Sequence, residues 1–438
     1  MTSRLICAAA FGLLGASAMA APVATGPVVL HCAKVFDSNS GKMRGETTIL
    51  IENGRISSML DGHVVPEKLQ ADYNIPGMTC MPGMIDSHAH LTMQFSKSTY
   101  SDKFRMNPTD DAIRSTVYAR RTLAAGFTTV RNLGDDGNTS IALRDAINQG
   151  IVPGPRIFSA GGAIGTTGGH ADPTNGFRAD LEGDPGPKDG IINSAEDAWK
   201  AVRQHYKDGA DVIKIMPSGG VLDESSSADN AQMTIAEIKA VVAAAHDYGF
   251  TVAAHAHGAE AIRRSVIAGV DSIEHGTYMD DADMKLMKQH GTWFVPTIIA
   301  GKYVEEKAKE GWFPPQVARK AEEVGPLIQA TAGKAYKAGV KIAFGTDAGV
   351  YPHGQNAKEL EYMVEAGMPN VFVLQTATTH AAELLKQSKD LGSLEVGKFA
   401  DIIGVKGDPL SDITVMQHVM FVMKGGQVFT GGAAPTTN

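Results

Sequence analysis

The sequence has no long run of like charges and no concentration of positive charge. Its 438 residues carry 40 Lys and Arg against 48 Asp and Glu, a formal net charge of −8. This mildly acidic balance argues against nucleic acid or an anionic membrane as the natural partner. No stretch approaches the roughly 18 uninterrupted apolar residues of a membrane-spanning helix. A small-molecule ligand is therefore favoured.

Cysteine is also scarce, with Cys7, Cys32 and Cys80 as the only three. Their number and spacing exclude a zinc framework built from cysteines. An exported protein permits a disulfide between Cys32 and Cys80, but two buried thiols fit the sequence equally well. Both alternatives stay open at this stage.

The first 20 residues have the layout of a secretory signal peptide. Arg4 lies in a short polar start, residues 5–14 are mostly apolar, and Ala18, Met19 and Ala20 form a small-residue end. The alternative is a buried first helix. We expect residues 1–20 to be removed and the mature chain to be exported to a periplasm or beyond.

The middle of the chain alternates helix-like stretches with apolar, strand-like runs. Six of these runs follow a glycine suited to the end of a helix, namely 127–133, 210–216, 250–255, 270–275, 292–297 and 340–347. Two helices are expected to begin at Ser194 and Thr234, because Asp197 and Glu237 follow three residues later. With further strands at 84–90 and 156–160, the count is 6 + 2 = 8. This alternation predicts an α/β protein with a (β/α)8 TIM barrel over residues 83–389.

The two flanks differ from the middle. Both carry short alternating segments separated by turn signals such as Asn53-Gly54 and Gly425-Gly426. Neither flank is long enough to bury a core alone. We therefore predict one small β-sandwich domain, built from residues 21–82 plus 390–438, with the barrel inserted between its halves.

Several metal-binding side chains occur at the ends of the predicted strands. His88 and His90 are two residues apart on one strand, so both imidazoles face the same side. His255, His275 and Asp347 each end another strand, at the face where barrel enzymes place their active sites. Imidazole and carboxylate ligands suit a transition metal such as zinc. Their convergence predicts a metal site.

Lys214 lies inside an apolar run, where an ammonium group is costly to bury unless it is paired or neutralised. An unprotonated lysine can react with carbon dioxide to give a carbamate, whose two oxygens are able to bridge two metal ions. The alternative is a lysine that extends to the rim of the barrel or pairs with an acid.

Taken together, several motifs resemble the amidohydrolase superfamily. They are Pro82–His90, Gly126–Arg131, His255–His257, Ser272–Gly276, Gly345–Asp347 and Gly392–Asp401. The match spans nearly the whole mature chain. Within the superfamily, the sequence is most similar to the Xaa-Pro dipeptidase and imidazolonepropionase-like branch, which also includes amidases acting on N-acyl amino acids such as ochratoxin A.

This resemblance implies a site for two divalent metal ions, usually zinc. It assigns one ion to His88, His90 and Asp347, the other to His255 and His275, and the bridging position to carbamylated Lys214. Asp347 is the natural proton shuttle, since a carboxylate can accept a proton from the attacking water and deliver it to the leaving amine.

Further residues are expected to contact the substrate. His170, in a Gly-rich loop, and His257, at the barrel mouth, are candidates to polarise a carbonyl oxygen. By analogy with the branch, His170 is favoured for the carbonyl, and Arg131 or the loop 218–222 for a substrate carboxylate. Within that loop the candidates are Gly220, Val221 and Leu222. Each residue could equally hold its own loop in place.

We therefore expect a secreted binuclear hydrolase that cleaves the amide bond of an Xaa-Pro dipeptide or of an N-acyl amino acid such as ochratoxin A. The alternative within enzymes is a cyclic amide hydrolase of the imidazolonepropionase or hydantoinase type. A non-catalytic barrel that only binds a ligand is a remote alternative, because all six ligand positions hold competent side chains. The branch also implies a homo-oligomer.

Overall fold

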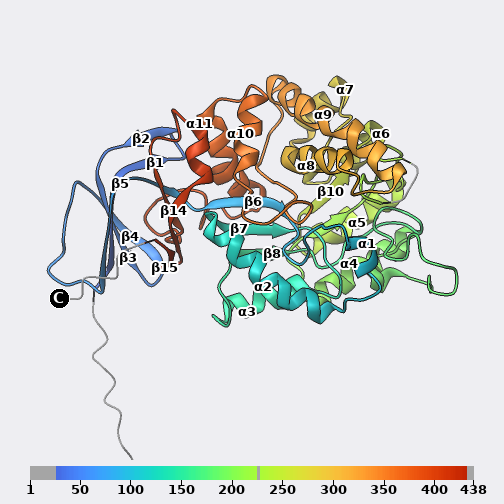
Figure 1. Ribbon diagram of the computed structural model, residues 1–438, viewed down its shortest axis with the longest axis horizontal. Helices are drawn as coiled ribbons and strands as arrows, with labels where there is room; N and C mark the ends of the chain where they lie inside the picture. Colours follow the sequence, from blue (N-terminus) through green and yellow to red (C-terminus); the bar gives the residue numbers. More distant parts are fainter. Residues whose placement is uncertain (1–25, 224–226, 432–438) are drawn as a thin grey trace, which may run out of the picture.

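The computed structural model describes residues 26–223 and 227–431. The segment expected to be a signal peptide lies outside the described residues. A β-rich part formed by both ends of the chain stands beside a larger α/β part (Figure 1). No helix in the described portion has the length and apolar character required to cross a membrane.

The β-rich part is one sheet of eight strands. Its members are β1 (Val28–Asp37), β2 (Lys42–Arg44), β3 (Thr47–Glu52), β4 (Arg55–Asp61), β5 (Ala71–Pro82), β13 (Ile402–Lys406), β14 (Val419–Lys424) and β15 (Gln427–Thr430). The order β15-β14-β13-β5-β1-β3-β4, with β2 paired to β1, joins the two ends of the chain. The strands from both ends of the chain form this one hydrogen-bonded sheet, and its folding into a sandwich stays a prediction. Antiparallel pairing of β13 with β5 makes the C-terminal strands a continuation of the N-terminal sheet.

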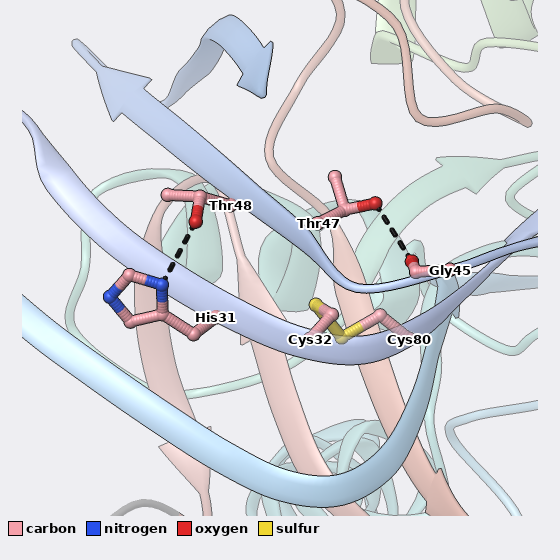
Figure 2. Close-up of a disulfide and its surroundings, with 6 residues drawn as sticks. All are labelled: His31, Cys32, Gly45, Thr47, Thr48 and Cys80. Carbon is pink, nitrogen blue, oxygen red and sulfur yellow. Dashed lines mark hydrogen bonds between the residues drawn. A yellow bond between two sulfur atoms is a disulfide. The ribbon is translucent and has the colours of Figure 1, made fainter. Parts of the chain in front are cut away.

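A disulfide between Cys32 and Cys80 links two neighbours in this sheet, β1 and β5 (Figure 2). Both cysteines are buried, together with Leu30, Ile49 and Phe421. Next to the disulfide, His31 Nδ1 lies 3.0 Å from Thr48 Oγ1 of β3. The structure therefore favours the disulfide over the two free thiols that the sequence left open.

The larger part is an α/β fold of the TIM-barrel type, with two parallel sheets at its centre. One contains β6 (Met84–Ala89), β7 (Phe127–Asn132) and β8 (Arg156–Ser159), and the other contains β9 (Ile213–Ile215), β10 (Val252–Ala256), β11 (Ser272–His275) and β12 (Trp293–Val295). Backbone hydrogen bonds join the sheets on one side, from Ile164 N to Lys214 O (2.8 Å) and from Met216 N to Ile164 O (2.9 Å).

The eighth predicted strand, 340–347, is irregular. It joins the two sheets on the other side through backbone hydrogen bonds from Phe294 N to Lys341 O (2.8 Å) and from Asp347 N to His88 O (2.7 Å). These contacts form isolated bridges and not a continuous strand. Asp347 has a φ of 61°, which interrupts an extended strand. The last of the eight predicted strands is therefore a bent connection, and it turns Asp347 toward β6.

Helices surround these strands (Figure 1). They are α1 (Thr99–Asp102), α2 (Pro108–Ala124), α3 (Thr139–Asn148), α4 (Ala195–Asp208), α5 (Ile235–Asp247), α6 (Ala259–Ala268), α7 (Asp281–His290), α8 (Ile298–Lys309), α9 (Pro315–Ala338), α10 (Lys358–Glu365), α11 (Asn370–Gln375) and α12 (Ala381–Leu384). Short helical turns are η1 (Pro187–Asp189), η2 (Thr376–His380) and η3 (Ile413–Gln417). Both predicted caps are confirmed, because Ser194 and Thr234 accept hydrogen bonds from the backbone of Asp197 and Glu237. The pair α8 and α9 lies over the mouth of the strands and contributes to the cavity described below.

Candidate active site

The tightest group of metal-binding side chains among the described residues is His88, His90 and Asp347. One ligand atom from each lies within 4.8 Å of the others. The distance from His90 Nε2 to Asp347 Oδ1 is 3.1 Å, and that from His88 Nε2 to the same oxygen is 3.5 Å. His88 lies near the end of β6 and Asp347 in the bent connection, so the irregular backbone at 347 is what brings the carboxylate onto the two imidazoles.

The second group consists of His255, His275 and Lys214, at or near the ends of three adjacent strands. The ring centroids of His255 and His275 are 4.6 Å apart, and those of His275 and His88 are 4.9 Å apart. Lys214 Nζ lies 3.4 Å from His88 Nε2, so this member of the second group contacts the first. All six predicted ligands therefore face one cavity.

The ligand imidazoles are oriented by contacts at one ring nitrogen. Nδ1 of His88 lies 2.8 Å from Glu274 Oε2, that of His90 3.0 Å from Gly134 O, and that of His275 2.7 Å from Thr297 Oγ1. In each of these rings Nε2 remains for a metal ion. His255 is reversed, since its Nε2 lies 3.1 Å from Gly219 O, which leaves Nδ1. Such outer contacts fix the tautomer and ring orientation of metal-binding histidines.

The electrostatics fit a metal ion. Burial, with smaller effects of neighbouring cationic groups, holds the pKa of His255 and His275 well below the usual value, so both rings are neutral and able to bind a cation. Burial raises the pKa of Asp347, but the facing His88 and His90 lower it by more. The net pKa is well below its usual value, so the carboxylate is ionised. Burial lowers the pKa of Lys214 to about 8, although the negative charges of Glu274 and Asp347 act to raise it. A neutral amine is therefore accessible near physiological pH.

Two of these residues have strained backbones. His275 and Asp347 have φ values of 70° and 61°, in a region that side chains other than glycine seldom occupy. Such conformations persist where the surrounding structure holds them, and they concentrate at functional sites. Here the strain turns the last residue of β11 and the bent connection toward the same cavity.

Arg131 does not lie where the sequence analysis placed it. It is 1% exposed, does not line the cavity, and donates hydrogen bonds to Ser87 O, Ser272 Oγ and Glu274 Oε1. The expectation that it binds a substrate carboxylate is therefore wrong. Burial raises the pKa of Glu274, but the Arg131 charge and the hydrogen bond from His88 lower it to about 2. Arg131 keeps Glu274 ionised, and Glu274 in turn orients His88.

His170 and His257 lie beside the second group, with ring centroids 4.5 Å and 4.8 Å from that of His255. His170 Nδ1 is 2.6 Å from Asp223 Oδ2, and its backbone N–H donates to Gln232 Oε1 at 2.8 Å. His257 Nδ1 is 2.8 Å from Thr277 Oγ1. Both histidines line the cavity, as expected. Val221 and Leu222 line it too, whereas Gly220 packs against the His170 ring, where a Cβ would come within 2.0 Å of a ring carbon.

The cavity has a volume of about 230 Å³, and much of its wall is apolar. Met93 and Phe95 come from the connection after β6, and further apolar lining comes from α8 and α9, namely Ala300, Val304, Val324 and Ile328. Among its described lining residues, Lys214 is the only lysine or arginine. The arrangement can hold cations at its base and an apolar group against its wall.

Two comparisons with known proteins agree with this geometry. Residues 79–429 match the amidohydrolase family model. The chain belongs to the amidohydrolase family. Ochratoxinase of Aspergillus niger is 32% identical over 384 residues, which cover 83% of this chain and 77% of that protein. These relationships make the chain an enzyme, a metal-dependent amide hydrolase.

Solved structures place this amidohydrolase further within its family. A Xaa-Pro dipeptidase with bound methionine in its active site has a TM-score of 0.90 and 47% identity, over 92% of this chain and 100% of that chain. A prolidase complexed with N-methylphosphonate-L-proline has a TM-score of 0.85 and 32% identity, over 92% of this chain and 100% of that chain. The resemblance to the Xaa-Pro dipeptidase and ochratoxinase branch is confirmed.

Sequence reasoning missed three polar residues that hold the site together: Glu274, Asp223 and Lys320. Glu274 had a usable signal, since it is a charged residue inside a buried strand and next to a ligand. Asp223 and Lys320 had none, because they meet across 97 residues of sequence.

Proposed function

We propose that this amidohydrolase uses two divalent metal ions, zinc in the first instance, to cleave the amide bond of a small linear substrate with a free carboxylate. The substrate class is a dipeptide of the Xaa-Pro type or an N-acyl amino acid such as ochratoxin A. The observation that carries the proposal is the convergence of all six ligand-type side chains on one cavity with an apolar wall. Relatives named as a Xaa-Pro dipeptidase and an ochratoxinase support the substrate class.

In this proposal His88, His90 and Asp347 hold one ion, and His255 and His275 hold the other. The neutral amine of Lys214 would add to carbon dioxide and release one proton to solvent, and the resulting carbamate would supply an anionic ligand to both ions. When bound, the ions lower the pKa of a water molecule and polarise the scissile carbonyl. The lowered pKa of Lys214 and its place between the two histidine groups support its modification.

The remaining chemistry belongs to side chains of this chain. Asp347 accepts a proton from the attacking water and delivers it to the leaving nitrogen, which is otherwise too basic to depart. His257 and His170 contact the carbonyl oxygen. The ring of His257 is neutral, because burial, with a smaller effect of His170, lowers its pKa to about 3. Thr277 Oγ1 lies 2.8 Å from Nδ1, and if it donates there the ring carries its proton on Nε2 and can donate it to the substrate.

We also propose that the protein is exported after removal of residues 1–20. The Cys32–Cys80 disulfide supports this, because disulfides persist in oxidising compartments. An intact-mass measurement of the protein purified from the periplasm and the medium tests it. Full-length protein retained in the cytoplasm would contradict export. The expected homo-oligomer stays a prediction, which the mass in solution would test.

The deciding experiment uses protein produced with zinc and bicarbonate, and the same protein after chelation. Both are assayed against Xaa-Pro dipeptides, N-acyl-phenylalanines and cyclic imides. Chelator-sensitive release of an amino acid from a linear substrate is expected. Turnover confined to cyclic imides would replace the proposal with ring opening, and a preparation that binds no metal would overturn the binuclear site.

A further inference from the structure

The side chain of His170 is held from three directions. Asp223 meets its Nδ1 at 2.6 Å, Gln232 accepts its backbone N–H, and Gly220 packs against the ring face. The ring of His255 lies on it as well, with a centroid distance of 4.5 Å. Within the described residues Nε2 has no hydrogen-bond partner, so it is the nitrogen available to a substrate.

Asp223 is itself fixed by a lysine from another element. Lys320 of α9 is 5% exposed, and its Nζ donates to Asp223 Oδ1 (2.9 Å), Asp223 O (2.9 Å) and Gly220 O (2.8 Å). The other carboxylate oxygen of Asp223 receives Gly220 N–H at 3.1 Å as well as His170. One ammonium group therefore holds both the turn 220–223 and the carboxylate that faces His170.

Lys320 and Asp223 form a largely buried pair with several hydrogen bonds, which distinguishes them from an ion pair on the surface. Exposed pairs contribute little to stability, whereas a buried charge is costly unless it is well paired. These three contacts of Lys320 lie on the turn that supports His170. Helix α9 also supplies Val324 and Ile328 to the cavity wall, so the same helix shapes the pocket and fixes the histidine.

We propose that Asp223 and Lys320 are positioning residues that orient the His170 ring, with Nδ1 on the carboxylate and Nε2 toward the substrate. The assignment rests on the proposed function, because His170 acts on the substrate only if an amide is cleaved here. Neither residue touches the reacting atoms. Both act through His170.

The variant Asp223→Asn tests this with a directed change. Lys320 can only donate hydrogen bonds, and its charge-assisted contact at 2.9 Å outweighs the neutral Gly220 N–H contact at 3.1 Å. The amide oxygen of the new Asn therefore stays on Lys320, and its NH2 group turns to His170 Nδ1. Nδ1 must then accept, so the ring proton moves to Nε2. In 15N-histidine spectra of the metal-loaded enzyme, assigned with His170→Asn, we expect Nδ1 of His170 to be protonated in the wild type and unprotonated in the variant.

A second variant tests whether loss of the Nδ1 proton comes from the Asn amide or from unfolding. In Asp223→Asn with Lys320→Met, the Asn amide is free to turn its oxygen back to Nδ1, so we expect the Nδ1 proton to return. Thermal unfolding of each variant establishes that it is folded. An Nδ1 proton unchanged by Asp223→Asn in a folded enzyme would overturn the assignment, and so would its absence in the double variant.

Kinetics supply an independent readout. Misplacing a reacting group by about 1 Å can cost roughly 10²-fold in rate, so we expect Asp223→Asn to lower kcat by about that factor with little change in KM. Added to His170→Asn, the same change should have no further effect, because residues acting as a unit are not additive. Additive losses would show a separate structural role. Lys302→Met, which breaks an exposed pair with Glu365 of α10, is the matched control and should leave kcat unchanged.

The two levels of the proposal fail separately. If no amide substrate is cleaved while the Nδ1 proton behaves as expected, the positioning of His170 stands and the proposed function is wrong. If an amide is cleaved but the proton does not respond to Asp223→Asn, the proposed function stands and the positioning role is wrong.

Discussion

The two sides of the cavity are built in different ways. On the metal side, the ligands lie on or next to neighbouring strands, and their outer contacts come from the same strands or their immediate continuations. On the substrate side, His170 lies in a long loop and depends on Asp223, Gly220 and, through them, Lys320 of α9. The metal side is fixed by the sheet, and the substrate side by contacts between loops and a helix.

This difference predicts how the two sides respond to substitutions. Ligands on parallel strands are positioned by the backbone ladder, so they tolerate changes in the surrounding loops. A histidine held by a loop and a helix moves when either changes. We therefore expect variants on the metal side to abolish catalysis or metal binding, and variants on the substrate side to alter the rate with the metals in place.

The largest loss of activity is expected from Asp347→Asn. The substitution keeps the shape of the side chain but removes the base, and positioned acid–base groups contribute roughly 10²–10⁴-fold in rate. We expect kcat to fall by at least about 10³-fold with the fold retained. Metal content measured on the same sample separates loss of the proton shuttle from loss of a ligand. Substantial turnover by the metal-loaded variant would remove this role from Asp347.

A smaller loss is expected from Gly220→Ala on the substrate side. The added methyl group would come within 2.0–2.4 Å of atoms of the His170 ring, so the ring must shift. We expect a loss in kcat of up to about 10²-fold with metal content unchanged. Gly186→Ala is the matched control, because a Cβ there meets nothing within 4 Å. Equal activity of the two variants would mean that the His170 position does not matter for turnover.

The next largest effect is expected on metal affinity, when the contact between Glu274 and His88 is broken. Glu274→Gln removes the charge that orients His88 and pairs with Arg131. Outer contacts of this kind are worth roughly 10–100-fold in metal affinity, so we expect a loss in that range by competition with a chelator. Ser272→Ala, which removes only a hydroxyl group 2.5 Å from Glu274 Oε1, should cost less. Equal affinity in Glu274→Gln and the wild type would contradict the role.

The metal side was also the part that the sequence could predict. The alternation of glycine-ended helices and apolar runs defines the strand ends, and the metal-binding side chains occur at those ends. Parallel strands bring their ends to one edge, so local patterns were enough to place His88, His255 and His275 together. The bent connection at 340–347 was predicted as a regular strand because its apolar pattern does not reveal the φ of 61° at Asp347.

The substrate side could not be predicted in the same way. Arg131 was expected at a substrate carboxylate, but its side chain turns inward to Glu274, a choice made by the charge of a residue 143 positions away. Similarly, the partnership of Asp223 with Lys320 depends on how α9 crosses the turn after β9, which no local pattern encodes. The single terminal sheet shows the same limit, since short strand signals do not reveal that β13 continues from β5.

The smallest effect on activity is expected from removing the disulfide, which lies in the terminal sheet and outside both sides of the cavity. Cys32→Ala with Cys80→Ala removes a crosslink between residues 48 apart. Such a crosslink contributes about 2–4 kcal/mol to the free energy of unfolding. We expect a lower thermal midpoint with kcat nearly unchanged, measured against the wild type with and without reductant. A fall in kcat as large as that of Gly220→Ala would show that the terminal sheet controls the site, because β5 leads directly into β6 and the residues that it carries.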